Sequence, residues 1–202
     1  MRLHFAACAA LIFFAGTALA QTAQHKATTV IAAPTLSVDQ MVAAANAEKT
    51  LLKSIYQAPT DTSLASMHPH SRIGAMVLAA KQYEFHPAVG GPAVIAALPR
   101  TRAEVEALHR FCDADSDIAG MERYFYGTAL QSATTHPEKL TLVLHNVATS
   151  YAVDYPGAPA GGSWYCSELE NVRAALPQQY DRAAKQLEPG ERAFLAECAA
   201  GS

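Results

Sequence analysis

The sequence predicts an all-α protein: a single compact domain of about six to eight helices behind a cleaved signal peptide. Residues that favour helix starts are followed by apolar side chains at helical spacing along most of the chain. Half of the residues are apolar, which is enough for one core in a chain of this length. No segment alternates apolar and polar residues over the length of a strand, and no Asn-Gly or Asp-Gly pair marks a hairpin.

The first residues of the chain have the pattern of an export signal. Arg2 is followed by an apolar run that begins at Phe5, and Ala18-Leu19-Ala20 forms an A-x-A cleavage site. The run is shorter than the ~20 residues that span a bilayer. We therefore expect residues 1–20 to be removed, the mature chain to begin at Gln21, and the protein to be periplasmic or secreted.

The charge balance excludes two classes of partner. The chain has a formal net charge of −3 at pH 7, and the loss of Arg2 with the signal lowers it to −4. Nucleic acids and anionic membranes are bound by clusters of Lys and Arg, which this sequence lacks. No apolar run long enough to cross a bilayer follows the signal, so we expect no stable membrane insertion after cleavage.

Composition divides the chain into a signal peptide (1–20), a flexible N-terminal arm (21–34) and a helical domain (35–202). The arm is small, polar and rich in Thr, and it ends in Pro. Within the domain, Pro, Gly, Ser and Thr mark the breaks between apolar stripes. The segments expected before residue 100 are helices over 35–57 and 72–83, a loop over 58–71, a turn over 86–92, and a helical turn or short strand over 93–98.

Helix starts are well marked in the second half of the domain. Thr101 and Glu104 form a capping box, in which each side chain can accept a backbone N–H near the other. Asp115 or Ser116 can cap the next helix, and Pro137 stands early in the one after, where its missing N–H costs nothing. The later segments are a loop over 155–162, a helix capped by Ser163, a new helix or kink at Pro177, and a last helix from near Pro189.

Three cysteines remain after cleavage of the signal: Cys112, Cys166 and Cys198. Two of them should pair in an oxidising compartment, and their spacing fits neither a zinc knuckle nor a C-x-x-C redox pair. A break at Pro177 lets the chain fold back on itself. We therefore predict a disulfide between Cys166 and Cys198, with Cys112 as a buried thiol.

A short histidine motif is the strongest hint of metal chemistry. His68 and His70 are two residues apart in an expected loop, where both rings can face one ion. His86, with Glu84 as a further ligand, would complete a zinc site that leaves one position open for water. The other interpretation is a solvated loop with exposed histidines, because the helical motif H-E-x-x-H is absent.

Nucleophilic catalysis is poorly supported. No G-x-S-x-G elbow occurs, and Ser163 is better explained as a helix cap. Cys112 lies three residues from His109 on one side of a helix, yet an exposed reactive thiol is readily oxidised outside the cytoplasm. The acidic stretch 113–117 resembles the first half of a calcium loop without its later Gly and Glu, and we interpret it as negative charge at a helix start.

Two aromatic clusters are candidates for a binding surface: Tyr124-Phe125-Tyr126 and Trp164-Tyr165. Adjacent residues on a helix cannot all face the core, so at least one of the first three is expected at the surface or in a groove. Aromatic side chains are also prominent among the residues that dominate binding energies. We predict Tyr124 and Tyr126 as partner-binding residues.

These observations favour an exported, non-catalytic protein without a cofactor that binds a protein partner in the cell envelope. An inhibitor or immunity-type protein is one concrete form. Two alternatives stay open: a small zinc-dependent hydrolase that uses the His-x-His loop, and a carrier of a small ligand or lipid. A carrier needs an apolar cavity between its helices.

Overall fold

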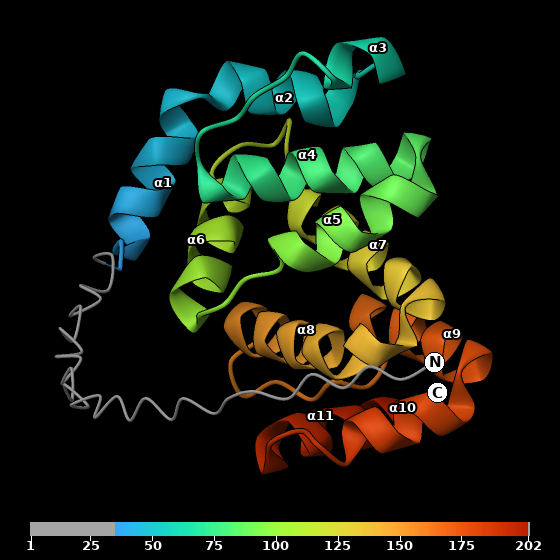
Figure 1. The fold of residues 1–202 in the computed structure, drawn as a ribbon. Coiled ribbons are helices and arrows are strands. Elements are labelled where there is room, and N and C mark those ends of the chain that lie inside the picture. Colours follow the sequence, from blue (N-terminus) through green and yellow to red (C-terminus); the bar gives the residue numbers. More distant parts are fainter. Residues whose placement is uncertain (1–34, 202) are drawn as a thin grey trace, which may run out of the picture. The chain divides into compact units, whose positions relative to one another are not determined.

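The structure is a computed structural model that describes residues 35–201, and these residues fold into eleven α-helices and one short 3-10 helix (Figure 1). No strand occurs among them, which confirms the all-α prediction. The number of helices exceeds the six to eight that were predicted. The predicted signal peptide (1–20) and arm (21–34) lie outside the described residues. The helices from α1 to α11 pack together as one compact unit.

The first predicted helix, 35–57, is in fact two helices separated at Glu48. They are α1 (Val38–Ala47) and α2 (Lys49–Gln57), and a third short helix, α3 (Asp61–Leu64), forms within the predicted loop. Glu48 leaves helical geometry at φ −116° and ψ 20°. Its carboxylate accepts the backbone N–H groups of His70 and Ser71 at 2.8 and 2.9 Å, and it also accepts the Ser71 hydroxyl. The Glu48 carboxylate therefore lies at the N-terminus of the helix that begins at Arg72, where negative charge is favourable.

The predicted turn over 86–92 is wrong, because residues 87–92 belong to a helix. Helix α4 (Arg72–Phe85) is followed directly by α5 (Pro87–Ala97), with Pro87 at the first position of α5. Helices α4 and α5 pack closely against each other (Figure 1). A Cβ atom on Gly90 would lie 2.3 Å from the backbone of Tyr83. Gly90 thus allows α4 and α5 to pack closely, and Gly91 lies against Ser132, whose hydroxyl oxygen would be 2.9 Å from an added Cβ.

Helix α6 (Arg102–Asp113) begins where the sequence predicts. The Thr101 hydroxyl accepts the N–H of Glu104 at 3.2 Å. The second hydrogen bond of the capping box differs by one residue: the Glu104 carboxylate accepts the backbone N–H of Arg100 instead of that of Thr101. Helix start and cap are confirmed.

Helix α7 (Met121–Thr135) begins several residues later than predicted. Asp115 does not cap it, because its carboxylate is bound by Lys49 and Lys53 of α2, each at 2.8 Å. These ammonium groups hold the pKa of Asp115 far below its usual range. Gly120 precedes the helix with φ +87°, a conformation that favours glycine.

The remaining boundaries follow the sequence closely. Residues 155–162 contain no helix, the Ser163 hydroxyl accepts the N–H of Cys166, and Pro177 begins a new helix. The elements are the 3-10 helix η1 (Pro137–Lys139), α8 (Leu140–Asp154), α9 (Trp164–Ala175), α10 (Pro177–Ala184) and α11 (Pro189–Ala200).

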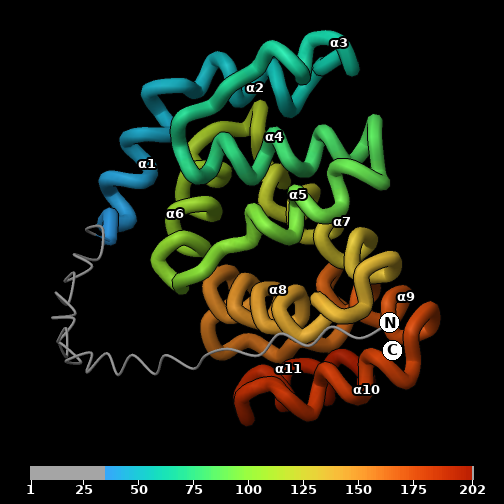
Figure 2. Tube along the Cα trace, in the orientation of Figure 1, coloured from blue at the N-terminus to red at the C-terminus, as the bar shows by residue number. Residues whose placement is uncertain are grey.

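Helix α7 packs against α4, α5, α6, α8 and α9 and so joins the two halves of the helical unit. The tube in Figure 2 shows α1–α6 on one side and α8–α11 on the other, with α7 passing between them. The predicted disulfide is present: Cys166 of α9 and Cys198 of α11 have Cα atoms 4.8 Å apart. Cys112 is a buried free thiol. Within residues 35–201, no helix combines the length and apolarity that crossing a membrane requires.

Candidate functional site

A buried polar network links α6, α8 and α9. His109 Nδ1 lies 2.5 Å from an oxygen of Asp154, and His109 Nε2 lies 2.9 Å from the Ser150 hydroxyl. The Ser150 hydroxyl lies 2.8 Å from the hydroxyl of Tyr165, which donates to the second Asp154 oxygen at 2.7 Å. Four side chains thus form a closed ring of contacts. Ser150, His109 and Asp154 stand in the order of a Ser-His-Asp triad.

The four residues are connected like a catalytic triad, but a substrate cannot reach the Ser150 hydroxyl. Ser150 is completely buried, and its hydroxyl lies between His109 and Tyr165. It also sits within α8, where the backbone N–H groups are used by the helix and cannot form an oxyanion hole. In this conformation Ser150 cannot reach a substrate carbonyl. Burial raises the pKa of Tyr165, and the nearby Asp154 raises it further, so the phenol remains a donor.

A shallow depression of about 520 Å³ adjoins one edge of this ring. His109 and Asp154 form part of its wall, together with the exposed residues Arg110 and Asp113. Arg110 is already paired with Asp39 at 2.7 Å. The hydrogen bonds among His109, Ser150, Asp154 and Tyr165 mainly hold α6, α8 and α9 together.

Cys112 is unsuited to act as a nucleophile with His109. Both side chains are buried, and burial raises the pKa of the Cys112 thiol far above its usual range, with Glu122 adding to the increase. The reactive form of cysteine is the thiolate, which this environment disfavours. His109 directs both of its ring nitrogens to Asp154 and Ser150.

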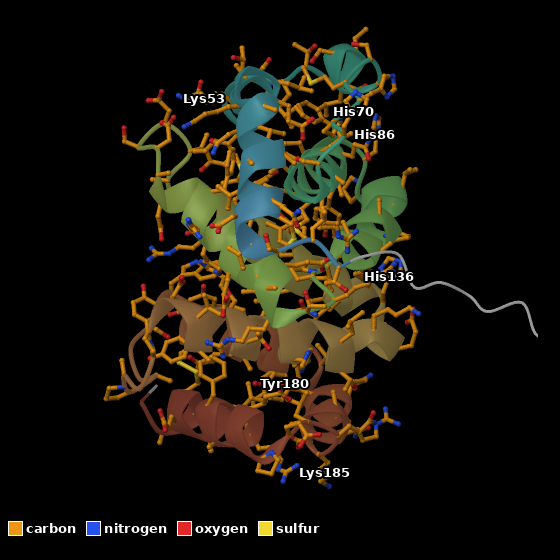
Figure 3. All side chains as sticks on the ribbon, turned by 90° about the vertical axis from the view of Figure 1, so that its left-hand side faces the viewer. Lys53, His70, His86, His136, Tyr180 and Lys185 are labelled. Carbon is orange, nitrogen blue, oxygen red and sulfur yellow. A yellow bond between two sulfur atoms is a disulfide. The ribbon has the colours of Figure 1, made fainter. Side chains whose placement is uncertain are left out.

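Of the three predicted zinc ligands, His86 has its ring engaged in another contact. His86 Nε2 lies 2.6 Å from a carboxylate oxygen of Asp61 in an exposed pair between the end of α4 and α3. His70 donates its backbone N–H to Glu48 (His70 and His86 are labelled in Figure 3). In the described part of the chain, no three His, Cys, Asp or Glu side chains are grouped so that they could hold a metal ion. The structure therefore does not bring His68, His70 and His86 together as a ligand set.

The aromatic cluster of α7 divides between core and surface. Tyr126 is completely buried, with its ring stacked on His109 at a centroid distance of 6.1 Å and its edge against Phe125. Tyr126 therefore cannot face a partner, and its prediction as a binding residue is wrong. Tyr124 is partly exposed, as one member of the cluster was expected to be. Its hydroxyl donates to Glu84 at 2.8 Å.

Tyr124 lines a pocket between α7 and α9 with a volume of about 340 Å³, which we name the α7–α9 pocket. The indole of Trp164 rests beside Gly127, where a Cβ atom would stand 3.3 Å from Trp164 Cζ2. Arg123 is held by a hydrogen bond to the hydroxyl of Tyr155 at 3.1 Å. The lining residues are Arg123, Tyr124, Gly127, Thr128, Gln131, Trp164 and Glu168.

Two polar side chains of the α7–α9 pocket are available to a ligand. Among residues 35–201, the Gln131 amide and the Glu168 carboxylate have no hydrogen-bonding or ionic partner. The pocket therefore combines two partly exposed aromatic rings, a guanidinium and two polar groups whose hydrogen-bonding capacity is unused. Aromatic residues and Arg are enriched at protein interfaces relative to the rest of the protein surface.

A second pocket, which we name the α9–α11 pocket, lies between α9, α10 and α11 and has a volume of about 330 Å³. The disulfide forms part of its wall, next to Leu169, Leu195 and Tyr180. Arg173 of α9 lies with its guanidinium carbon 6.0 Å from the centroid of the Tyr180 ring. The pocket is mostly apolar, with charged groups at its edge.

Part of this arrangement has a signal in the sequence. Ser150 and Asp154 are four residues apart and so share one face of a helix, which is the spacing of interacting side chains. Their contacts with His109 and Tyr165 depend on how three helices pack, and no local pattern indicates them. The sequence shows that Trp164 is aromatic, but its place in the same pocket as Tyr124 depends on tertiary packing. No protein-family model, no curated protein and no solved structure matches this chain.

Proposed function

We propose that this chain is a non-catalytic binding protein, exported to the periplasm or the cell exterior, that contacts a protein partner through the α7–α9 pocket. The single observation that carries the proposal is the grouping of Trp164, Tyr124 and Arg123 on one accessible surface. Trp, Tyr and Arg are the residue types that most often dominate the binding energy of protein interfaces.

The aromatic side chains of this surface are held in place before binding. The Tyr124 hydroxyl is bonded to Glu84, and Lys81 Nζ lies 4.4 Å from the centroid of the Tyr124 ring. The Trp164 ring packs on α7 at Gly127 and edge-on to Tyr165 at a centroid distance of 5.1 Å. Side chains that are already ordered lose little conformational entropy when a partner binds.

Export is supported by two independent features. Residues 1–20 have the composition of a signal peptide, and Cys166 and Cys198 form a disulfide. Disulfides persist in oxidising compartments such as the periplasm. A partner in the cell envelope follows from that location, and an inhibitor or immunity-type role is one form that such binding takes.

Co-purification from the native cell envelope tests the proposal. Trp164→Ala removes the largest ring of the pocket and should abolish recovery of the partner while the helical circular dichroism signal persists. Leu142→Ala is the matched control, because Leu142 is an apolar residue with 43% exposure that lies outside the pocket. Equal recovery of the same partner by wild type and Trp164→Ala would contradict the proposal.

A further inference from the structure

We propose that the α9–α11 pocket binds a small amphipathic carboxylate, with the apolar chain of the ligand inside the pocket and its carboxylate at Arg173 and Tyr180. This site lies on different side chains from those that carry the proposed partner contact. The two proposals can therefore succeed or fail separately.

The walls of the pocket suit an apolar chain. Three helices surround it, and its volume of about 330 Å³ stands near the lower end of the ~300–1,000 Å³ typical of small-molecule sites. Burial of an apolar chain is favourable in proportion to the surface that it removes from water. The apolar lining consists of Leu169, Ala174, Pro177, Leu195, Ala199 and the Cys166–Cys198 disulfide.

Tyr180 supplies a hydrogen-bond donor with no partner in the described structure. Its side chain is only 6% exposed, and Figure 3 shows it between α10–α11 and the neighbouring helices. The hydroxyl makes no hydrogen bond within residues 35–201 and is not among the fully enclosed polar atoms, and Tyr180 is one of the residues that line the pocket. Burial raises the pKa of Tyr180 to about 12, which keeps the hydroxyl protonated at neutral pH.

Arg173 supplies a positive charge at the edge of the same pocket. Its guanidinium lies over the Tyr180 ring, and no carboxylate of the described residues lies within 4 Å of it. A guanidinium and a nearby hydroxyl can each donate to one oxygen of a carboxylate, and bonds to a charged acceptor are stronger than neutral ones.

The remaining charge favours a ligand with one negative charge. Glu170 also lines the pocket, one turn before Arg173 on α9, and it has no ionic partner among the described residues. A phosphate with two negative charges would meet one cation and one carboxylate, so repulsion from Glu170 would offset much of its attraction to Arg173. A monocarboxylate can place its two oxygens at Arg173 and Tyr180, away from Glu170.

Titration of the mature protein with decanoate, below the concentration at which decanoate forms micelles, tests this site. Isothermal titration calorimetry should show saturable binding of one decanoate per chain. Ala174→Phe fills the pocket and should abolish binding, whereas Ala175→Phe adds the same ring at an exposed position outside the pocket and should leave binding intact. Absence of saturable binding to the wild type, or equal binding by both variants, would overturn the proposal.

A second pair of measurements tests the carboxylate contact without altering the shape of the pocket. Arg173→Gln should weaken decanoate binding by about tenfold, as expected for loss of a charge-assisted hydrogen bond, and leave the binding of the neutral alcohol decanol unchanged. An equal effect on both ligands would refute the role of Arg173. Co-purification of the protein partner should be unaffected by Arg173→Gln, which keeps this outcome distinct from that of the proposed function.

Discussion

The indole of Trp164 lies against α7 at Gly127, where a Cβ atom would stand 3.3 Å from Trp164 Cζ2. A side chain at position 127 would therefore push the indole away from its present position against the helix. Because the same pocket contains Tyr124, which lies three residues before Gly127 on α7, this contact sets how the two aromatic rings are presented together. Placement of Trp164 by Gly127 is thus the structural basis of the proposed binding surface.

Gly127→Ala should displace the indole by a few tenths of an ångström. Trp164 is the only tryptophan of the chain, so its fluorescence emission reports this site alone. We expect a shifted emission spectrum with a stability change within about 1 kcal/mol, because the higher helix propensity of Ala offsets the tight contact. Gly190→Ala, with nothing within 4 Å of the added atom, should leave the emission unchanged. Identical spectra for wild type and Gly127→Ala would show that the Trp164 indole does not lie against Gly127.

Gly90→Ala should destabilise the fold much more strongly. The added Cβ would lie 2.3 Å from the backbone of Tyr83, and backbone atoms cannot move aside as a flexible side chain can. Overpacking of this kind should lower the free energy of unfolding by about 3 kcal/mol. Urea unfolding measures the loss. Gly190→Ala in α11 provides the control and should be neutral or stabilising, since its surroundings are open. A small effect at Gly90 would mean that α4 and α5 are not in close contact there.

The Cys166–Cys198 disulfide should contribute substantially to stability. It joins residues 32 apart, and the chain-entropy relation gives about 3–4 kcal/mol for a loop of this length. Replacement of both cysteines with Ser should lower the free energy of unfolding by that amount in urea titrations. Reducing agent should produce the same loss in the wild type and none in the double variant. Insensitivity of the wild type to reduction would contradict the prediction.

Glu48 should make stability depend on pH in the acidic range. Burial raises its pKa, but the hydrogen bonds from the Ser71 hydroxyl and from the backbone N–H groups of His70 and Ser71 outweigh burial, so the net pKa is lowered. A lowered pKa in the folded state means that the contribution is complete above the unfolded value of 4.5 and is lost as pH falls through the folded value.

Glu48→Gln should therefore flatten the stability curve at acidic pH. Between about pH 5 and pH 3 the wild type should lose more stability than the variant, as measured by urea midpoints. The control is Glu138→Gln, since Glu138 makes no ionic or hydrogen-bond contact through its side chain in the described part of the chain and should retain the wild-type slope. Parallel curves for wild type and Glu48→Gln would exclude this role of the carboxylate.

Local signals in the sequence were sufficient for much of the fold. Thr101 and Ser163 are hydroxyl residues before apolar stripes, and both cap helices as predicted. Pro177 lacks the N–H that a helix interior requires, so it begins α10 and allows α11 to return to α9. Each of these features depends on residues close together in the chain, which is why the sequence alone predicts them.

The incorrect predictions share a tertiary cause. Gly90 and Gly91 resemble a turn locally, but their small size allows α5 to pack against its neighbours. The sequence predicts Tyr126 at the surface, because adjacent aromatic residues on a helix cannot all face one core. Helix α7 is enclosed by helices on several sides, so two neighbouring rings, Phe125 and Tyr126, are both buried. The environment on each side of a helix is set by its neighbours in space.

The sequence predicts individual residues of the candidate site but not how they come together in space. The sequence predicts Tyr124 as a binding residue, and it places Trp164 directly after the helix cap Ser163. Their meeting in one pocket, with Arg123 beside them, depends on the packing of α7 on α9. The ring of Ser150, His109, Asp154 and Tyr165 likewise joins helices that are distant in the chain.

Site-specific photo-crosslinking at Gln131 tests the central claim most directly. Gln131 is an exposed residue of the α7–α9 pocket, so a photoreactive phenylalanine derivative can replace it without disturbing the core. Irradiation of cells that export this variant should yield a covalent adduct with one envelope protein. The same derivative at Leu142, which is exposed outside the pocket, should yield none, and Trp164→Ala should abolish the adduct at position 131. Crosslinks of equal yield from both positions, or no adduct at Gln131 in properly exported protein, would contradict the account.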